Sequence, residues 1–371
     1  AALHLAEGGA DVAVLEAAEP GWGASGRNGG QVIPGLKEDP RQIIARFGQK
    51  DGEAMVRASG AGADLVFGLI AEHGIECDAQ QNGWIQAAHT QGMLGDLRKR
   101  HQDWAQRDAN VAWLEPNELA QRMGDGRYKG GWIDKRGGGV QPLGYARGLA
   151  RAAQDLGARV HGSTPVLSLN QTTNGKVILA TNGYTDGLWP KLEHTVVPVF
   201  SVQVATAPLG ENIRGKVLGG GEVLSDTHRV LWYFRQDGHG RLLMGGGGSA
   251  YESGAVKVYE GLRQRIHSLL PEAGEIEFEY AWNGKVAITP DHYPHLHELA
   301  PGLLAGLGFN GRGVAMATMM GKILADRVLE TAQPEFEFPN MTPRPLPLHF
   351  MRGVAVTATR AYYRFRDALD G

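Results

Sequence analysis

The sequence has little or nothing of several features that mark particular protein classes. Its single cysteine, Cys77, excludes an internal disulfide and a multi-thiolate metal site, and agrees with a cytoplasmic, reducing compartment. Lys and Arg total 37 against 40 Asp and Glu, and the net charge of −3 gives no reason to expect a nucleic-acid partner. No apolar run approaches the ~20 residues of a membrane span, so we expect no integral membrane segment.

Motifs of hydrolases are also missing. The chain has no G-x-S-x-G nucleophile elbow and no HExxH helix. The stretch "DHYPHLH" carries His292, His295 and His297, but a proline interrupts it and no acidic or thiolate ligand accompanies the histidines. A polar loop is therefore favoured over a metal site, and we expect neither a bound metal nor a catalytic acid-base dyad.

The chain is long and rich in glycine. Its 371 residues are enough for two domains, at about 150 residues per domain. The hydrophobic fraction of 42% and charged fraction of 21% are ordinary for a globular protein, whereas the 54 glycines are about twice the usual share. The glycines cluster between apolar runs, which indicates loops with unusual backbone angles or close backbone contacts.

The first residues resemble half of a nucleotide-binding unit. "AALHLAE" is a helix that ends at Gly8, and residues 12–15 form a short apolar run, typical of a parallel strand buried on both faces. The run stops at Glu16, where a carboxylate can accept hydrogen bonds from ribose hydroxyls. The chain begins inside the helix, with no strand and no initiator methionine before it, so we expect residues upstream of Ala1.

Two further strand and helix units follow. The spacing predicts a helix over 142–156 that buries Leu143, Ala146, Ala150 and Ala153, followed by strands at 164–169 and 177–180. The third unit, within 302–330, runs from a strand through a glycine loop into a helix. That helix has one apolar face, formed by Met316, Met320, Ile323, Leu324 and Val328.

Between these units the pattern alternates, as in antiparallel strands. Residues 275–282 place Ile276, Phe278 and Tyr280 on one face, and a hairpin is expected to turn at Asp237. The predicted fold class is α/β, with a Rossmann-like nucleotide-binding domain from discontinuous segments and a mixed or antiparallel β-sheet substrate domain. The first domain comprises 1–47, 140–192 and 290–341, and the second comprises 48–139 and 193–289. The tail 342–371 is helical and arginine-rich; it could touch a membrane surface, but packing back on the protein is favoured.

Two glycine loops carry the chemistry. "GWGASGRNGGQ", residues 21–31, would let backbone N–H groups reach a pyrophosphate and let the chain lie flat on a planar ring. An Asn28-Gly29 turn in a surface loop would explain only these two residues, and not the other small residues or Arg27. "GLGFNGRGV", residues 306–314, places Arg312 at a helix N-terminus, which favours a negative charge such as that of a reduced flavin. "GGGGS" at 245–249 continues an apolar strand, so its backbone is expected to approach a ligand or a neighbour closely.

These motifs, together with "KVILATNGYTD", "WNGKVAITPDHYP" and the terminal "AYYRFRDAL", resemble the FAD-dependent amino acid oxidase family, which includes glycine oxidase. Within this family the sequence is most similar to the gamma-glutamylputrescine oxidase branch. The resemblance implies a two-domain fold with FAD bound in an extended form. The family's first strand and glycine fingerprint do not precede Ala1, and the segment 167–180 is shorter than its counterpart in the family.

The resemblance also implies a set of site residues. FAD would be held by Glu16, Ser25, Gly26, Arg27, Asn28, Gly29, Gly30, Gln31, Val166, Ala180, Thr181, Asn182, Gly183, Gly308, Gly311, Arg312, Gly313 and Val314. The substrate would contact Trp84, Arg229, Trp232, Tyr233, Trp282, Asn310 and Arg312. Core packing is the default role for most of the tryptophans, and a solvated surface position is an equally ordinary alternative for Arg229.

The implied reaction moves hydride from an amine-bearing carbon to flavin N5 and releases an imine that water hydrolyses. The expected substrate is of the gamma-glutamylputrescine type, as in polyamine catabolism, and oxygen or a respiratory carrier takes the electrons. Sarcosine, glycine, proline or a D-amino acid is the alternative substrate, for an oxidase or a dehydrogenase. A flavin-free binding subunit is the alternative from another class.

Overall fold

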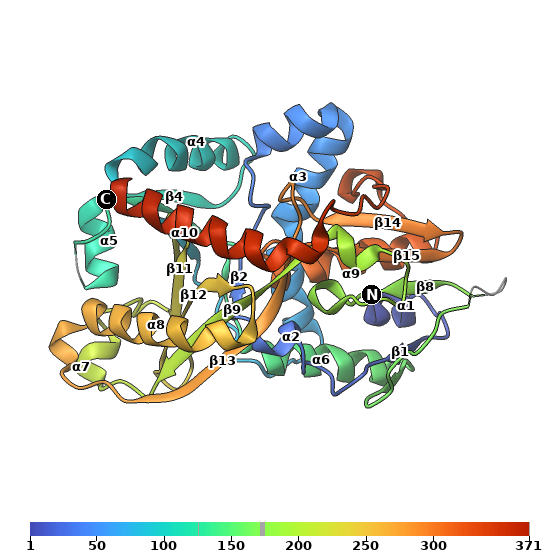
Figure 1. Cartoon of the computed structure of the whole chain (residues 1–371), viewed down its shortest axis with the longest axis horizontal. Coiled ribbons are helices and arrows are strands. Elements are labelled where there is room, and N and C mark those ends of the chain that lie inside the picture. Colours follow the sequence, from blue (N-terminus) through green and yellow to red (C-terminus); the bar gives the residue numbers. More distant parts are fainter. Residues whose placement is uncertain (125, 171–174, 371) are drawn as a thin grey trace.

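The computed structural model describes residues 1–124, 126–170 and 175–370, and confirms the α/β fold class (Figure 1). The helices are α1 (Ala2–Glu7), α2 (Ala24–Arg27), α3 (Pro40–Glu72), α4 (Leu94–Ala105), α5 (Pro116–Met123), α6 (Pro142–Asp155), α7 (Glu211–Arg214), α8 (Ala255–Leu269), α9 (Gly313–Val328) and α10 (Arg352–Asp370). The strands are β1 (Ala13–Leu15), β2 (Gln31–Val32), β3 (Trp84–Ala87), β4 (Val111–Leu114), β5 (Gly131–Asp134), β6 (Gly138–Gly139), β7 (Arg159–His161), β8 (Val177–Leu179), β9 (Val197–Thr206), β10 (Val223–Asp226), β11 (Trp232–Gln236), β12 (Leu242–Ser249), β13 (Phe278–Ile288), β14 (His295–Ala300) and β15 (Leu303–Leu307).

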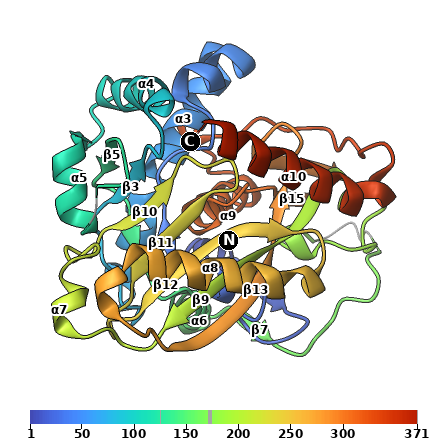
Figure 2. The same ribbon diagram turned by 60° about the vertical axis from the view of Figure 1, so that its left-hand side comes forward.

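The largest sheet has eight strands in the order β13-β9-β12-β11-β10-β3-β5-β4. Its strands come from two separate parts of the chain, which meet where β10 pairs in parallel with β3. One face packs under α8, which lies in front of this sheet in Figure 2, and buries Val202 and Phe234 in a cluster with Leu262 of α8. Since side chains alternate along a strand, the neighbours of Val202 and Phe234 in their strands point to the opposite face.

Two smaller sheets are formed by residues of the predicted nucleotide-binding domain. β1 pairs in parallel with β7, and β8 pairs in parallel with β15, which pairs with β14. We predicted that residues 12–15 would be buried on both faces, but Leu15 is 52% exposed. Among the described residues β1 has only β7 as a strand neighbour, so less of its surface is covered.

Three other predictions for single elements need correction. Residues 164–169 form no strand, and Leu167 is 90% exposed. Tyr280 is exposed because the pairing of β13 with β9 shifts register between Phe278 and Tyr280, which turns Tyr280 away from the buried face. Helix α6 buries Tyr145 and Ala152 with Ala153, a face rotated from the predicted one. Of the segment 167–180, residues 171–174 lie outside the described part of the chain.

Other predictions for elements are confirmed. The apolar face of α9 buries Met316, Met320, Ile323 and Leu324, and β11 and β12 form the expected hairpin around Asp237. Helix α3 is long and apolar enough by length and composition to span a membrane, yet 56% of its most apolar window is buried within the protein. It serves as a core helix that packs against α9.

Candidate functional site

The glycine loop at 21–31 is folded tightly around α2. The side-chain amide of Asn28 donates to the carbonyls of Ala24 and Ser25, and its oxygen accepts from the Gly30 amide at 2.8 Å. A Cβ at Gly30 would lie 2.0 Å from the Val140 carbonyl oxygen, and one at Gly26 would lie 2.2 Å from that of Gly21. Contacts within the protein therefore require glycine at Gly26 and Gly30, in addition to the cofactor contact predicted for this loop.

One row of paired residues crosses all eight strands of the large sheet and faces this loop. The strand registers align Trp113, Trp132, Gln86, Ser225, Tyr233, Gly245, Gln203 and Trp282. We call these eight residues the cross-sheet row. Because directly paired residues share a face, its aromatic and amide side chains form a single surface.

The end of the row near β13 contacts the loop directly. The Gln203 side-chain amide donates to the Arg27 carbonyl at 2.9 Å, and the indole N–H of Trp282 donates to the same oxygen at 2.8 Å. A Cβ on Gly29 would lie 2.7 Å from the ring of Tyr233. The ring of Tyr233 also covers Gly245, so the predicted close approach at "GGGGS" is confirmed as contact with a neighbouring side chain.

Gln203 has one unused atom. Its side chain is 2% exposed, and its Oε1 has no hydrogen-bond partner among the described residues. This oxygen lies 3.4 Å from where a Gly29 Cβ would be. A buried acceptor without a partner costs about 1–3 kcal/mol, so the atom is well suited to accept a hydrogen bond from a bound molecule.

The middle of the row is joined to the loop through Gln31. Its amide donates to the carbonyls of Leu224 and Phe234, and its oxygen accepts from the Ser225 hydroxyl. That hydroxyl accepts from the indole N–H of Trp84 at 3.1 Å. The side chain of Gln31 is therefore occupied by the sheet, which leaves its backbone as the part that could contact a cofactor.

The second predicted loop, 308–314, leads into α9. The Gly308 amide donates to Asn182 Oδ1 at 2.9 Å, so the structure brings the turn at 180–183 against this loop. Asn310, expected to contact substrate, instead donates to the Gly308 carbonyl and to Thr289, and its oxygen accepts from the Thr289 amide. Asn310 therefore holds the loop in shape.

The N-terminus of α9 is open. A Cβ on Gly311 or Gly313 would meet nothing within 4 Å. No side chain in the described part of the chain caps the helix, and the first amides of a helix have no intrahelical acceptor. This end of a 16-residue helix can therefore accept a negatively charged or carbonyl group of a ligand.

Arg312 supplies a cation beside these amides. Its guanidinium donates to the Pro34 carbonyl at 2.8 Å and lies 5.0 Å from the ring centre of Trp84. Burial lowers the pKa of Arg312 to about 9, which still leaves it protonated at neutral pH. It forms no ion pair with a carboxylate in the part of the chain that the structure describes.

Arg235 is a second buried cation, which the sequence analysis missed. It is 4% exposed and its Nε donates to the Gly29 carbonyl at 2.7 Å. Burial lowers its pKa to about 10, and no ion pair to a carboxylate is formed within the described ranges. The alternation of β11 could have revealed it, because Arg235 shares a face with Tyr233 two residues earlier.

Other predicted residues lie apart from this surface. Trp232 points to the opposite face of β11 from Tyr233 and packs against the core under α8. Arg229 forms ion pairs with Asp367 and Asp370 of α10 at 3.0 and 2.6 Å, so it is occupied by the terminal helix. Trp84, in contrast, lies on the face of the cross-sheet row: it is 2% exposed, packs edge-on against Trp132 and donates to the Ser225 hydroxyl.

The residues predicted to bind the adenosine end of FAD lie near β1. Glu16 follows the strand and its Oε1 accepts from the Ala18 amide at 3.0 Å. The Thr164 amide donates to the Glu16 carbonyl, which brings the segment that contains the 40% exposed Val166 next to this strand end. Ser25, Ala180 and Thr181 are exposed, whereas Gly183 is buried against the Lys285 carbonyl.

The histidines of "DHYPHLH" are engaged by the protein. His295 contacts Asp291 at 3.0 Å, and His297 Nδ1 contacts the Met341 carbonyl. Among the described residues, one group has ligand atoms close enough to share a metal ion. It comprises Glu7, Glu72 and His73, on the surface between α1 and α3.

Comparison with known proteins identifies the family. The family model described as "FAD dependent oxidoreductase" matches residues 1–327. The chain is 30% identical to "Probable oxidoreductase OrdL" of Haemophilus influenzae, with 89% of this chain and 80% of the relative covered. The chain belongs to the FAD-dependent oxidoreductase family.

The enzyme has further relatives. It is 28% identical to "Gamma-glutamylputrescine oxidoreductase" of Escherichia coli, with 99% of this chain and 90% of the relative covered. Its fold matches the crystal structure of glycine oxidase from Geobacillus kaustophilus with a TM-score of 0.71 and 21% identity, over 90% of this chain and 91% of that one. The chain is an FAD-dependent amine or amino acid oxidoreductase that acts on a small molecule.

Several features of the site fit FAD. The open amides at the start of α9, the cation Arg312 and the unpaired Gln203 Oε1 are the kinds of groups that a flavin ring and its substrate need. The glycine loop at 21–31 is already packed against the large sheet. It can therefore contact the cofactor through its backbone groups, and does not itself provide a cavity.

Proposed function

We propose that the enzyme oxidises the amine-bearing carbon of a gamma-glutamylated diamine of the gamma-glutamylputrescine type. The similarity over nearly the whole chain to the gamma-glutamylputrescine oxidoreductase supports this substrate class. Bound FAD supplies the two-electron acceptor. In this proposal the predicted cofactor residues, from Glu16 to Val314, keep their role, and oxygen or a respiratory carrier reoxidises the cytoplasmic enzyme.

The observation that carries the proposal is the unpaired Gln203 Oε1, which lies between Tyr233 and Trp282 near one end of the cross-sheet row. An amine N–H could donate to this oxygen while Tyr233 and Trp282 exclude water on either side. Exclusion of water lowers the pKa of a substrate ammonium group, which favours the neutral amine that can be oxidised. Burial raises the pKa of Tyr233 to about 12, so its phenol stays neutral and adds no charge there.

The other end of such a substrate carries a carboxylate. Arg312 is the cation best placed for it, since the buried guanidinium forms no ion pair among the described residues and retains unused N–H groups. A charge-assisted hydrogen bond from an arginine to a carboxylate is stronger than one between neutral groups. Putrescine, which lacks the carboxylate, should therefore bind more weakly than its gamma-glutamyl derivative.

The proposal is tested by anaerobic titration of the flavin-loaded enzyme, with bleaching of the oxidised flavin bands as the signal. Gamma-glutamylputrescine should bleach the flavin at a concentration at least about tenfold lower than putrescine does, the difference expected for one lost charged hydrogen bond. If glycine, sarcosine, proline or a D-amino acid bleaches the flavin more effectively, the substrate assignment is wrong. If the full-length protein binds no flavin, it acts as a binding subunit and the proposal fails entirely.

A further inference from the structure

The terminal helix α10 lies on the outside of the molecule, as Figures 1 and 2 both show. Contacts along one face of α10 hold the helix against the rest of the protein. Arg229 pairs with Asp367 and Asp370, and Gly353, its one fully buried residue, lies against the ring of Tyr251. The tail therefore packs back on the protein through this inner face.

The opposite face of α10 is apolar and exposed. Val354, Tyr362, Phe365 and Leu369 are 53–64% exposed, and with Ala358 they follow one another at intervals of three or four residues. Such spacing places them along one side of the helix, opposite Gly353 and Asp367. We call Val354, Ala358, Tyr362, Phe365 and Leu369 the outer stripe.

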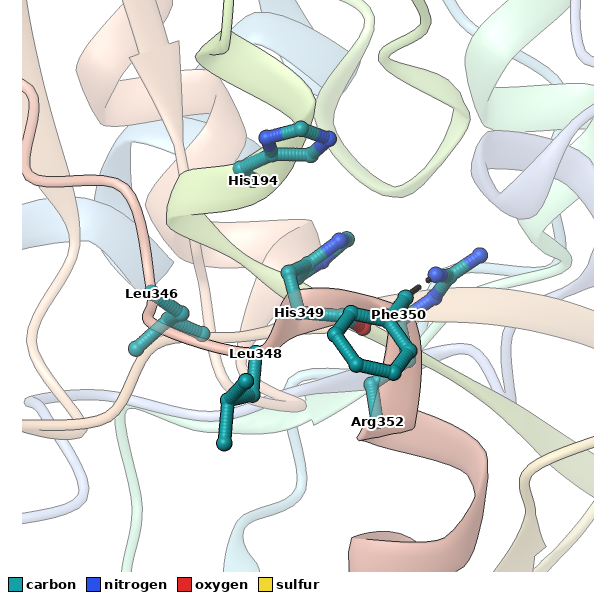
Figure 3. Close-up of a pocket in the computed structure, with 6 residues that line it drawn as sticks. All are labelled: His194, Leu346, Leu348, His349, Phe350 and Arg352. Carbon is teal, nitrogen blue, oxygen red and sulfur yellow. Dashed lines mark hydrogen bonds between the residues drawn. The ribbon is translucent and has the colours of Figure 1, made fainter.

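The segment before α10 extends the outer stripe. Leu348, Phe350 and Met351 are 64%, 77% and 45% exposed. Leu348 and Phe350 line a pocket of about 310 Å³ together with His194, Leu346, His349 and Arg352. Figure 3 shows these six residues, from the segment before α10, the start of α10 and residue 194. An apolar surface of this length on one side of a globular protein marks an interaction site.

The charged residues of α10 indicate what kind of partner binds the outer stripe. Arg352 and Arg364 are exposed and Arg366 is half-buried. The only carboxylates of the helix, Asp367 and Asp370, are both paired with Arg229. The surface that α10 presents to solvent is therefore apolar with positive flanks and no free carboxylate of its own.

A bilayer with anionic lipids matches both properties. Lipid headgroups would neutralise the arginines while the apolar side chains enter the boundary between headgroups and acyl chains. A second copy fits less well, because it would present the same surface and bring no unpaired carboxylate of its own α10 to the arginines. We propose that α10 docks the enzyme flat on an anionic membrane surface.

Sedimentation with lipid vesicles tests this proposal on the flavin-loaded, full-length chain. Vesicles of phosphatidylcholine with roughly one-quarter phosphatidylglycerol should bind the protein, pure phosphatidylcholine should bind it much less, and high salt should weaken binding. The double variant Phe365→Ser with Leu369→Ser should lower binding at least about tenfold through loss of apolar insertion. Arg364→Gln with Arg366→Gln should lower it roughly 25-fold, about fivefold for each charge.

Thr359→Ser is the matched control, since Thr359 is exposed on the same helix but outside the outer stripe. It should bind vesicles as the unchanged protein does. Absence of vesicle binding, or binding unaffected by the two stripe substitutions, overturns the proposal. So does a dimer in analytical ultracentrifugation that the same two substitutions dissociate, because the stripe would then bind a second copy. Flavin absorbance of each variant verifies that the protein remains folded.

Discussion

Replacement of Gly30 by alanine tests whether packing within the protein dictates the small residues of the glycine loop. Gly30 has a φ of +69°, and an added Cβ would lie 2.0 Å from the Val140 carbonyl oxygen and 2.8 Å from Arg235 Nη2. The Val140 amide also donates to the Gly30 carbonyl at 2.8 Å, so the two backbones are held together. A backbone oxygen cannot rotate away, and the pairing of β2 with β6 must shift to make room.

The expected cost has two parts. The left-handed backbone costs an alanine about 1–2 kcal/mol, and overpacking adds about 1–3 kcal/mol, so the free energy of unfolding should fall by about 2–5 kcal/mol. Gly74→Ala is the control, because Gly74 has a φ of +56° and nothing within 4 Å of the added Cβ. It should lose only the backbone part, about 1–2 kcal/mol.

Urea denaturation of both variants without flavin measures the costs, and flavin absorbance of the purified proteins measures how much cofactor each retains. Gly30→Ala should be less stable than Gly74→Ala and should retain less flavin, since the displaced loop contacts the cofactor in our proposal. Equal stability of the two variants would refute the packing argument. Flavin loss without any extra loss of stability would mean that the ligand, and not Val140, requires the glycine.

Four further substitutions test single residues of the site and the fold. Arg312→Met should slow anaerobic flavin reduction by gamma-glutamylputrescine at least about tenfold, by loss of a charged hydrogen bond; an unchanged rate would remove Arg312 from the site. Gln203→Leu should raise the KM for the amine roughly tenfold or more if Oε1 accepts its N–H, whereas an unchanged KM with equal or greater stability would show that the oxygen has no ligand. Arg229→Ala should leave KM unchanged and increase hydrogen exchange in α10, and a raised KM would restore the predicted substrate role. Burial raises the pKa of Asp291, but the hydrogen bond and charge of His295 outweigh it and bring the pKa to about 2, from 3.8. The stability that Asp291 contributes is therefore present above pH 4 and is lost as the pH falls from about 4 to about 2. Because solvent screens this half-buried group, Asp291→Asn should cost about 1 kcal/mol at neutral pH and almost nothing near pH 2 in urea denaturation.

Sequence periodicity predicted the buried residues correctly where the geometry of a single helix determines which residues share the buried face. Met316, Met320 and Ile323 share a face of α9 because helical geometry alone puts them there. The face of α6 could not be predicted in the same way, since this helix contacts both the core and the glycine loop, where Leu143 lies against Gly21 and Gly26. Tyr280 was misplaced because a bulge depends on the partner strand.

The sequence by itself determined the α/β class, the two glycine loops and the family, because these are carried by residues close together along the chain. Only the tertiary structure decided which side chains meet at the site. The cross-sheet row depends on the register of eight strands, and the Arg235 to Gly29 hydrogen bond joins residues 206 positions apart. Whether Trp232 or Tyr233 faces the loop likewise follows from strand pairing. Contacts of this kind arise from long-range packing, which periodicity along one strand or helix does not specify.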